Sequence, residues 1–292
     1  MRSDVNLLKV AEEYLISNRG AFIYLLLDHG GMPGLSSQLS MSAIERKNLF
    51  EATAIRVPMS VAPVLVPVGD CSTIHSHASL FKWVVKNGNF SSAVVMFSSC
   101  ESVDVVMKRL MFRLDIALSD NTSALLRFYD PRILESLVKI LTVEQAKNFF
   151  SLASQWWYID RCGGLQQIGS NFFACQEAEM PLRLSAAQEF SLVDSTEPDR
   201  VLLALRQNAP HLIANISLAE QYNFAVNSIR SAMGYGLEST TDYVLYSVLS
   251  LIYGTEFAVR HEWQSVLAKV RSEPGTFAEL VANTDDVAIW DI

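Results

Sequence analysis

The stretch LLRFYDPRILESL, residues 125–137, begins with the pattern of a β-strand and ends with that of an α-helix. Leucine and aromatic side chains before Asp130 favour an extended chain. Asp130 is a typical N-cap residue, and Pro131 suits the first helical position because its missing N–H is not needed there. The stretch therefore predicts a strand that runs directly into a helix.

Alternation along the expected strand places its side chains on two faces. Arg127 and Tyr129 share one face, while Leu126 and Phe128 share the other. The polar and apolar halves of the strand are therefore expected to meet different surroundings.

Two arginines stand at this otherwise apolar joint, Arg127 in the expected strand and Arg132 just after the proline. An arginine on a covered strand needs a carboxylate or carbonyl partner. Asp28 and Asp115 are both candidates, and the sequence does not choose between them. We expect the two arginines to brace the strand-to-helix joint, although a contact with a partner protein is the alternative.

Strand and helix patterns alternate on both sides of this stretch. Expected strands cover residues 21–28, 62–68, 92–99, 112–118 and 124–130, and expected helices cover 3–18, 75–88, 99–112, 131–141 and 142–150. Pro63 and Pro67 mark 62–68 as an edge strand or extended loop. SDNTS (119–123) predicts a hairpin turn, and two more strands are expected within 155–178. The sequence thus predicts an α/β (α+β) lobe with a mixed sheet.

The pattern changes after about residue 180. Helical periodicity dominates, and proline and glycine fall only at the joints between helices. We therefore expect two domains, an α/β domain over residues 1–178 and an all-helical domain over residues 179–292.

Composition narrows the function classes. The chain has 292 residues, 50% of them hydrophobic, and a net charge of −8. This charge argues against nucleic-acid binding, which depends on neutralising phosphates. The N-terminus lacks the pattern of a signal peptide, and no apolar run reaches the roughly 20 residues of a membrane span. The four cysteines have neither zinc-ligand nor disulfide-scaffold spacing, so reduced thiols and a cytoplasmic location are expected.

One short segment concentrates side chains that could do chemistry. GDCSTIHSH (69–77) carries Asp70, Cys71, His75 and His77. It leads into a helical pattern, where residues two apart diverge by roughly 200°. A solvated helix start is therefore favoured over a metal site. We predict no catalytic residue, no metal and no cofactor, and we keep as an alternative a hydrolase or metal-dependent enzyme that uses Asp28, His75 and His77. That alternative requires the three side chains to converge within roughly 4 Å.

Trp156 and Trp157 are adjacent in an expected strand, so their rings must point to opposite faces. One ring can fill the core. The other must meet a second layer, solvent or a partner, and coverage by the helical domain is the favoured explanation. Both residues are kept as candidates for partner contact.

Several segments, in their order, resemble the effector adaptor or chaperone family of bacterial type VI secretion, a family defined by a domain of unknown function. These segments are YLLLDHG (24–30), NLFE (48–51), APVLVP (62–67), the helix of Trp83, MFSSCESVDVVMKRLMFRL (96–114), LLRFYDPRIL (125–134) and EQAKNFF (144–150). The most specific element is Arg-Phe-Tyr-Asp-Pro-Arg at 127–132. Asp28 and Trp83 are the other motif residues. The similarity covers roughly residues 20–160, and residues 229–257 resemble the C-terminal region found with that domain.

The resemblance implies a binding function and no enzyme activity. Such proteins bind a toxic effector in the cell that makes it, often through the N-terminal segment of the effector. They help to load the effector onto the valine-glycine repeat spike (VgrG) or its PAAR tip. We therefore expect an effector and a spike protein as partners, and neither nucleic acid nor membrane. A structural or regulatory protein of the same apparatus is the competing interpretation.

Overall fold

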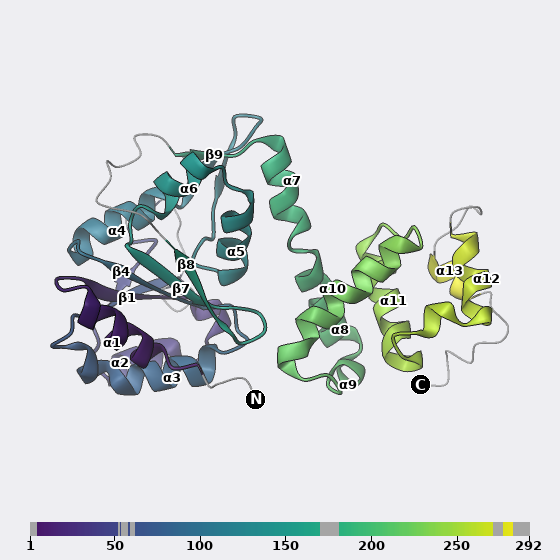
Figure 1. The fold of residues 1–292 in the computed structure, drawn as a ribbon, viewed down its shortest axis with the longest axis horizontal. Coiled ribbons are helices and arrows are strands. Elements are labelled where there is room, and N and C mark those ends of the chain that lie inside the picture. Colours follow the sequence, from purple (N-terminus) through teal and green to yellow (C-terminus); the bar gives the residue numbers. More distant parts are fainter. Residues whose placement is uncertain are drawn as a thin grey trace. The chain divides into compact units, whose positions relative to one another are not determined.

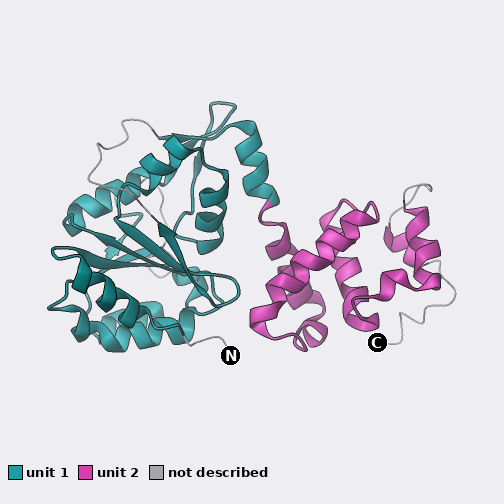
Figure 2. Ribbon diagram, viewed as in Figure 1, with its two compact units in different colours: residues 1–194 teal, residues 195–292 magenta. Residues whose placement is uncertain are grey.

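The structure is a computed structural model that describes residues 5–51, 53, 58, 62–169, 181–270 and 277–282 (Figure 1). The chain divides into two compact units, Met1–Asp194 (unit 1) and Ser195–Ile292 (unit 2), coloured separately in Figure 2. Unit 1 combines β-sheets with helices, and the described part of unit 2 consists of helices and their connections. The predicted fold class is thus confirmed.

A six-stranded sheet forms the middle of unit 1. Its strands lie in the order β2 (Lys47–Asn48), β3 (Val64–Gly69), β1 (Phe22–Leu27), β4 (Val94–Ser99), β7 (Gln155–Ile159) and β8 (Leu165–Gly169). Every neighbouring pair in this sheet is antiparallel. β4 and all of β1 after its first residue are buried on both faces, which is why their sequences are continuous apolar runs.

Helices cover both faces of this sheet (Figure 1). One face carries α1 (Leu7–Ser17), α2 (Leu35–Met41) and α3 (Ala78–Gly88), and the other carries α4 (Val103–Phe112), α5 (Pro131–Ile140) and α6 (Val143–Phe150). Successive strand residues point to opposite faces. Leu25 and Met96 therefore belong to one hydrophobic core, and Leu26 and Phe97 to the other. Unit 1 thus has a core on each side of its central sheet.

A second sheet of three strands has the order β6 (Ser123–Leu125), β5 (Asp115–Ala117) and β9 (Leu182–Arg183). β5 and β6 form the hairpin that the sequence predicts, and β9 adds in parallel to β5. The strand expected over 124–130 is too long, because β6 ends at Leu125. The Asp130 N–H donates to the Arg127 carbonyl at 2.9 Å, so the chain turns before the helix begins.

Pro67 lies within β3, and Pro63 lies just before its first residue. β3 lies between β2 and β1, so it is not the last strand of the sheet. β2, however, pairs only with Val64 and Leu65. Pro67 lies beyond that pairing, where no neighbour on that side needs its missing N–H. The prediction of an edge strand is therefore wrong for the start of β3, which β2 covers, and it describes only the part of β3 beyond Leu65.

The boundary between the units comes later than the expected position after residue 178, which lies outside the described residues. The contacts divide the chain after Asp194. β9 pairs with β5, and α7 (Ala186–Asp194) packs against α5. Glu189 of α7 also accepts hydrogen bonds from the N–H and hydroxyl of Ser119 at 2.5 and 3.1 Å. These links tie residues 181–194 to the α/β unit.

Unit 2 has its own hydrophobic core. Its helices are α8 (Glu197–Asn208), α9 (Pro210–Ile213), α10 (Leu218–Gly234), α11 (Thr240–Tyr253), α12 (His261–Lys269) and α13 (Phe277–Ala282). Tyr246, Phe257 and Trp263 lie at its centre. The ring centroid of Phe257 is 4.9 Å from that of Tyr246 and 5.2 Å from that of Trp263. Among the described residues, no helix combines the length and the apolarity that crossing a membrane requires.

Candidate functional site

The motif stretch meets the central sheet at the carboxyl end of β1. Asp28 follows β1 directly, and its carboxylate accepts the Gly30 N–H at 3.0 Å, which starts a short 3₁₀ turn. Nη2 of Arg127 lies 3.2 Å from Oδ2 of Asp28. The Asp28 side chain is 8% exposed, whereas that of Arg127 is 52% exposed. Of the two candidate partners, the structure therefore selects Asp28, and Asp115 is exposed on β5.

Because the chain turns after β6, residues 126–129 do not alternate between two strand faces as the sequence predicted. Because residues 126–130 are not a strand, alternation does not apply to them. Leu126, Phe128 and Tyr129 are all buried, and Arg127 is the residue whose side chain reaches the surface. Arg127 and Tyr129 still lie together, since the guanidinium carbon is 5.6 Å from the centre of the Tyr129 ring.

Electrostatics around Arg127 favour its charged form. Partial burial alone would lower the pKa of the guanidinium, but Tyr129, Asp28 and Asp130 together raise that pKa above its usual value. Burial raises the pKa of the Tyr129 phenol, and the nearby carboxylates of Asp28 and Asp130 raise it further against the opposing effect of Arg127. The site therefore holds a permanent cation beside a neutral phenol.

Asp130 forms the second half of the joint. It caps α5, accepting the Arg132 backbone N–H at 3.0 Å, with Pro131 in the first turn as the sequence predicts. Its two oxygens also accept from Nε and Nη2 of Arg132, at 2.9 and 2.7 Å. One buried carboxylate thus serves as both a helix cap and the acceptor of a two-point arginine contact.

The aromatic motif residues are core residues. Phe128 has no exposed area and meets Phe149 edge-on, with ring centroids 5.7 Å apart. Tyr129 meets Phe50 in the same way at 6.1 Å. The aromatic motif residues therefore pack into the core, and the polar motif residues hold the same turn through hydrogen bonds and ion pairs.

A third carboxylate–arginine pair lies one turn farther along α5, and no local pattern in the sequence singles it out. Oε2 of Glu135 lies 2.5 Å from Nη1 of Arg161, which belongs to the turn between β7 and β8. Burial raises the pKa of the nearby Tyr158 to about 12, and the charges of Glu135 and Asp160 contribute. This pair connects α5 with the β7–β8 hairpin.

Two buried arginines near the end of α4 were also missed, one in its last turn and one at its C-cap. Arg109 and Arg113 look like helix-end charges in sequence, yet both are buried. Nη1 of Arg109 lies 2.6 Å from Oε1 of Glu101, and Arg113 donates to the carbonyls of Phe149 and Arg109 at 2.6 and 2.7 Å. The available signal was their spacing, since residues four apart share a helix face and the buried Leu110 belongs to that face.

The tryptophans predicted as partner contacts lie inside unit 1. Trp156 and Trp157 point to opposite faces of β7, as expected, and join the two different cores. They are 0% and 3% exposed, so in this structure neither ring is available to a partner. The cover over Trp157 includes α1 of the same unit, whose Tyr14 ring lies 5.1 Å away, so its burial does not require the helical domain. Trp83 on α3 is partly buried against the same core as Trp157.

The residues of the enzyme alternative do not come together. The register pairs Leu27 with Val64 and Ile23 with Gly69, so Asp28 and the segment after Gly69 lie at opposite ends of β1. A six-residue strand spans about 17 Å. His75 instead faces Glu12 at 3.1 Å, and Nδ1 of His77 contacts the neighbouring Ser76 hydroxyl. The convergence that this alternative requires is therefore absent from the structure.

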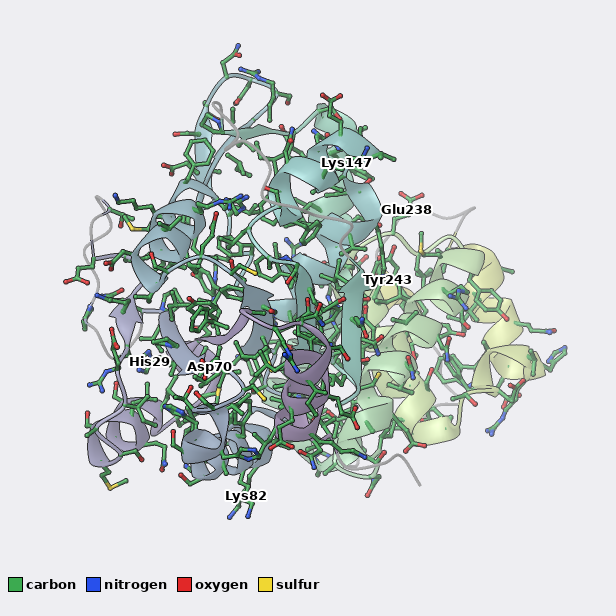
Figure 3. The ribbon with its side chains drawn as sticks, turned by 60° about the vertical axis from the view of Figure 1, so that its left-hand side comes forward. His29, Asp70, Lys82, Lys147, Glu238 and Tyr243 are labelled. Carbon is green, nitrogen blue, oxygen red and sulfur yellow. The ribbon has the colours of Figure 1, made fainter. Side chains whose placement is uncertain are left out.

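His29 and Asp70, both labelled in Figure 3, have structural partners instead. His29 is buried, and its ring nitrogens contact the Ala62 carbonyl at 2.5 Å and the Ser36 hydroxyl at 2.8 Å. Hydrogen bonds from Ser72 and Thr73 lower the pKa of Asp70, which closes its own loop. Neither residue is left as an exposed reactive group.

No cluster of three or more possible metal ligands occurs among the residues that the structure describes. Cys71, Cys100 and Cys162 are free thiols, while Cys175 lies outside the described residues. At the joint, the groups that can interact with a partner are guanidinium groups, which form hydrogen bonds and ion pairs. Arg127 and Arg132 have side chains that are 52% and 38% exposed, and guanidinium groups donate readily to carboxylates and carbonyls.

Comparison with known proteins identifies part of unit 1. Residues 23–148 match the family described as "Domain of unknown function (DUF4123)". This range includes Asp28, Trp83 and the whole Arg127–Arg132 stretch. No curated protein matches the chain, and no solved structure does.

Proposed function

We propose that this protein is a non-enzymatic adaptor of type VI secretion, which binds a toxic effector in the cytoplasm of the producing bacterium and helps to load it onto the VgrG or PAAR spike. The observation that supports the proposal is the match of residues 23–148 to a family described as a domain of unknown function, because the adaptor family that the sequence resembles is defined by such a domain. Within that range, the motif residues form a folded joint with two partly exposed arginines.

The geometry supports binding in two ways. The most specific motif residues are tied to one another and to the core, so they are suited to hold a surface in shape. Asp28 lies at the opposite end of β1 from the segment that carries His75 and His77, as the β1–β3 register requires. An adaptor needs a stable surface rather than a reactive centre.

The partners give the direct test. The protein is co-expressed with the effector and the spike protein encoded next to its gene, and it is purified through an affinity tag. We expect the effector to co-purify, and the spike to join when all three are present. The proposal fails if neither partner co-purifies while the effector remains stable and is secreted without this protein.

A further inference from the structure

A cavity of about 280 Å³ opens at the end of the central sheet opposite to the motif joint. Three connections line it: the α1–β1 loop at Asn18–Ala21, the segment Ser99–Glu101 after β4, and Ser151–Ser154 before β7. Arg109 of α4 lines it as well. The cavity is therefore built by segments far apart in sequence and does not overlap the arginine–carboxylate joint.

The charged pair in this cavity is incompletely bonded. Arg109 is buried; its Nη1 pairs with Oε1 of Glu101, and its Nη2 donates to the Ser151 carbonyl at 3.1 Å. Nε of Arg109 and Oε2 of Glu101 are both buried and have no hydrogen-bond partner among the described residues. Buried polar atoms of this kind are rare, because each lost hydrogen bond is costly. Two residues that line the cavity thus carry one unused donor and one unused acceptor, both closed off from solvent in this structure.

These two atoms restrict what can occupy the cavity. An isolated anion would meet the carboxylate of Glu101, and an isolated cation would meet the guanidinium of Arg109. A peptide main chain is neutral and presents both carbonyl acceptors and N–H donors at intervals along its length. Because the Glu101 side chain is 28% exposed, its carboxylate is able to turn toward such a chain.

The surroundings fit an extended segment rather than a compact molecule. A second cavity of about 390 Å³ lies along the same loop and shares Asn18, Arg19 and Ala21 with the first. On the flanks of this loop, the apolar side chains of Ile16 and Phe22 are 69% and 39% exposed, so both can be reached by a bound segment. When an extended peptide binds, main-chain hydrogen bonds supply affinity and contacts with its side chains supply specificity.

We propose that these two cavities bind an extended segment of the effector, which crosses the α1–β1 loop and bonds through its main-chain amides to Arg109 and Glu101. The inference rests on the proposed function and adds the place and the chemistry of binding. The segment is recognised by its main chain at Arg109 and Glu101 and by apolar side chains at Ile16 and Phe22.

Cys100 makes the site testable, because it is exposed and lines the first cavity. Cys100→Trp fills the cavity from its surface side. Lys82→Trp places the same ring at an exposed position of α3, a helix that contributes no residue to the lining of either cavity; Lys82 is labelled in Figure 3. Binding of the full-length variants to the effector encoded beside the gene is measured by calorimetry. We expect Cys100→Trp to lower the affinity at least tenfold and Lys82→Trp to leave it within twofold of the original protein.

Cross-linking provides a second readout that does not depend on the tryptophan variant folding. In the first protein, the other three cysteines are changed to serine and a benzophenone is attached to Cys100. In the second protein, all four native cysteines are changed to serine and the benzophenone is attached to the cysteine introduced by Lys82→Cys. The effector should cross-link to the first protein and not to the second.

The outcomes separate the two proposals. If the original protein binds the effector but Cys100→Trp binds equally well and Cys100 gives no cross-link, the cavity assignment is overturned and the adaptor function stands. If the original protein binds no effector, the adaptor function is overturned and the cavity assignment is overturned with it.

Discussion

At the scale of single residues, unit 1 repeatedly places a shielded carboxylate against an arginine. Asp28, Asp130 and Glu135 are at most 22% exposed in their side chains, and each meets a guanidinium. The Asp28–Arg127 contact joins positions 99 residues apart in sequence. Such a pair adds little net stability when both partners are present, but removal of one partner leaves a buried charge.

Arg127→Ala is therefore expected to destabilise the protein. Asp28 would keep its bond from Gly30 and lose its counter-charge, and water reaches the site because Arg127 is half-exposed. We expect a loss of about 1 kcal/mol, seen as a fall in Tm of roughly 2–4 °C. Differential scanning calorimetry measures this shift.

Lys139→Ala provides the matched control, since it removes an exposed ion pair with Glu135 on the same helix. Its Tm should change by much less. An unchanged Tm for Arg127→Ala together with lost effector binding would instead make Arg127 a contact residue and contradict the bracing role.

Tyr158 gives a prediction for high pH. Burial, with help from Glu135 and Asp160, raises its pKa from 10.0 to about 12. Between these values the unfolded chain loses the phenol proton while the folded chain keeps it, so stability falls as pH rises. The fall is about 1.4 kcal/mol per pH unit for one tyrosine.

Urea unfolding at pH 9 to 12 measures this effect as a difference between the original protein and Tyr158→Phe. The variant should lose less stability over pH 10–12, because it lacks the titrating group. Parallel pH profiles for the two proteins would show that Tyr158 ionises normally in the folded state.

At the scale of elements, most helices and strands could be predicted, because local pattern determines them. The Thr142–Gln145 capping box is present at the start of α6, and the turn at Gly163 connects β7 with β8. The sequence-based predictions fail where contacts between distant segments determine the local structure. Leu126–Asp130 leave the strand to turn into α5, and β9 forms only because β5 lies beside it.

Two adjacent residues of α1, one buried and one exposed, allow the stability effects of their alanine substitutions to be compared. Leu15 is 2% exposed in the core under the sheet, and Ile16 is 69% exposed. Leu15→Ala should lower the free energy of unfolding by about 2–5 kcal/mol, because it removes buried methyl groups and leaves a cavity. Urea denaturation followed by tryptophan fluorescence measures the change.

Ile16→Ala should change the free energy of unfolding by no more than about 0.5 kcal/mol, since its side chain is largely in solvent. Equal losses for Leu15→Ala and Ile16→Ala would contradict the docking of α1 on the sheet through its Leu15 face.

The candidate site was predictable in part, for the same physical reason. The motif residues and the Asp130 cap were visible in sequence, as was Asp28 as one of two partners for Arg127. The choice between Asp28 and Asp115, and the burial of Arg109 and Arg113, depend on how strands and helices pack. Local sequence patterns do not indicate such contacts between distant segments. The same holds for the packing of α1 over Trp157.

At the scale of the whole molecule, the chain has two units with separate cores. A chain that ends at Asp194 keeps β9, α7 and the contact of Glu189 with Ser119, whereas one that ends at residue 178 loses all three. We expect the longer fragment to unfold at a higher urea concentration, with a single transition by circular dichroism. Equal midpoints would place the structural boundary earlier than Asp194.

The two units also suggest how an adaptor could serve two partners. Unit 1 contains the region that matches the domain family and the cavities proposed to bind the effector. Unit 2 has a hydrophobic core of its own. If the protein joins effector to spike, as proposed, it requires a second surface for the spike.

Secretion in living cells tests the central claim most directly. The gene for this protein is deleted, and the effector encoded beside it is measured in the medium and inside the cell, with and without a restored copy. The adaptor account predicts that the effector disappears from the medium, that other substrates of the apparatus are still released, and that the restored gene reverses the loss. Secretion of the effector at its normal level from the deletion strain would contradict the account.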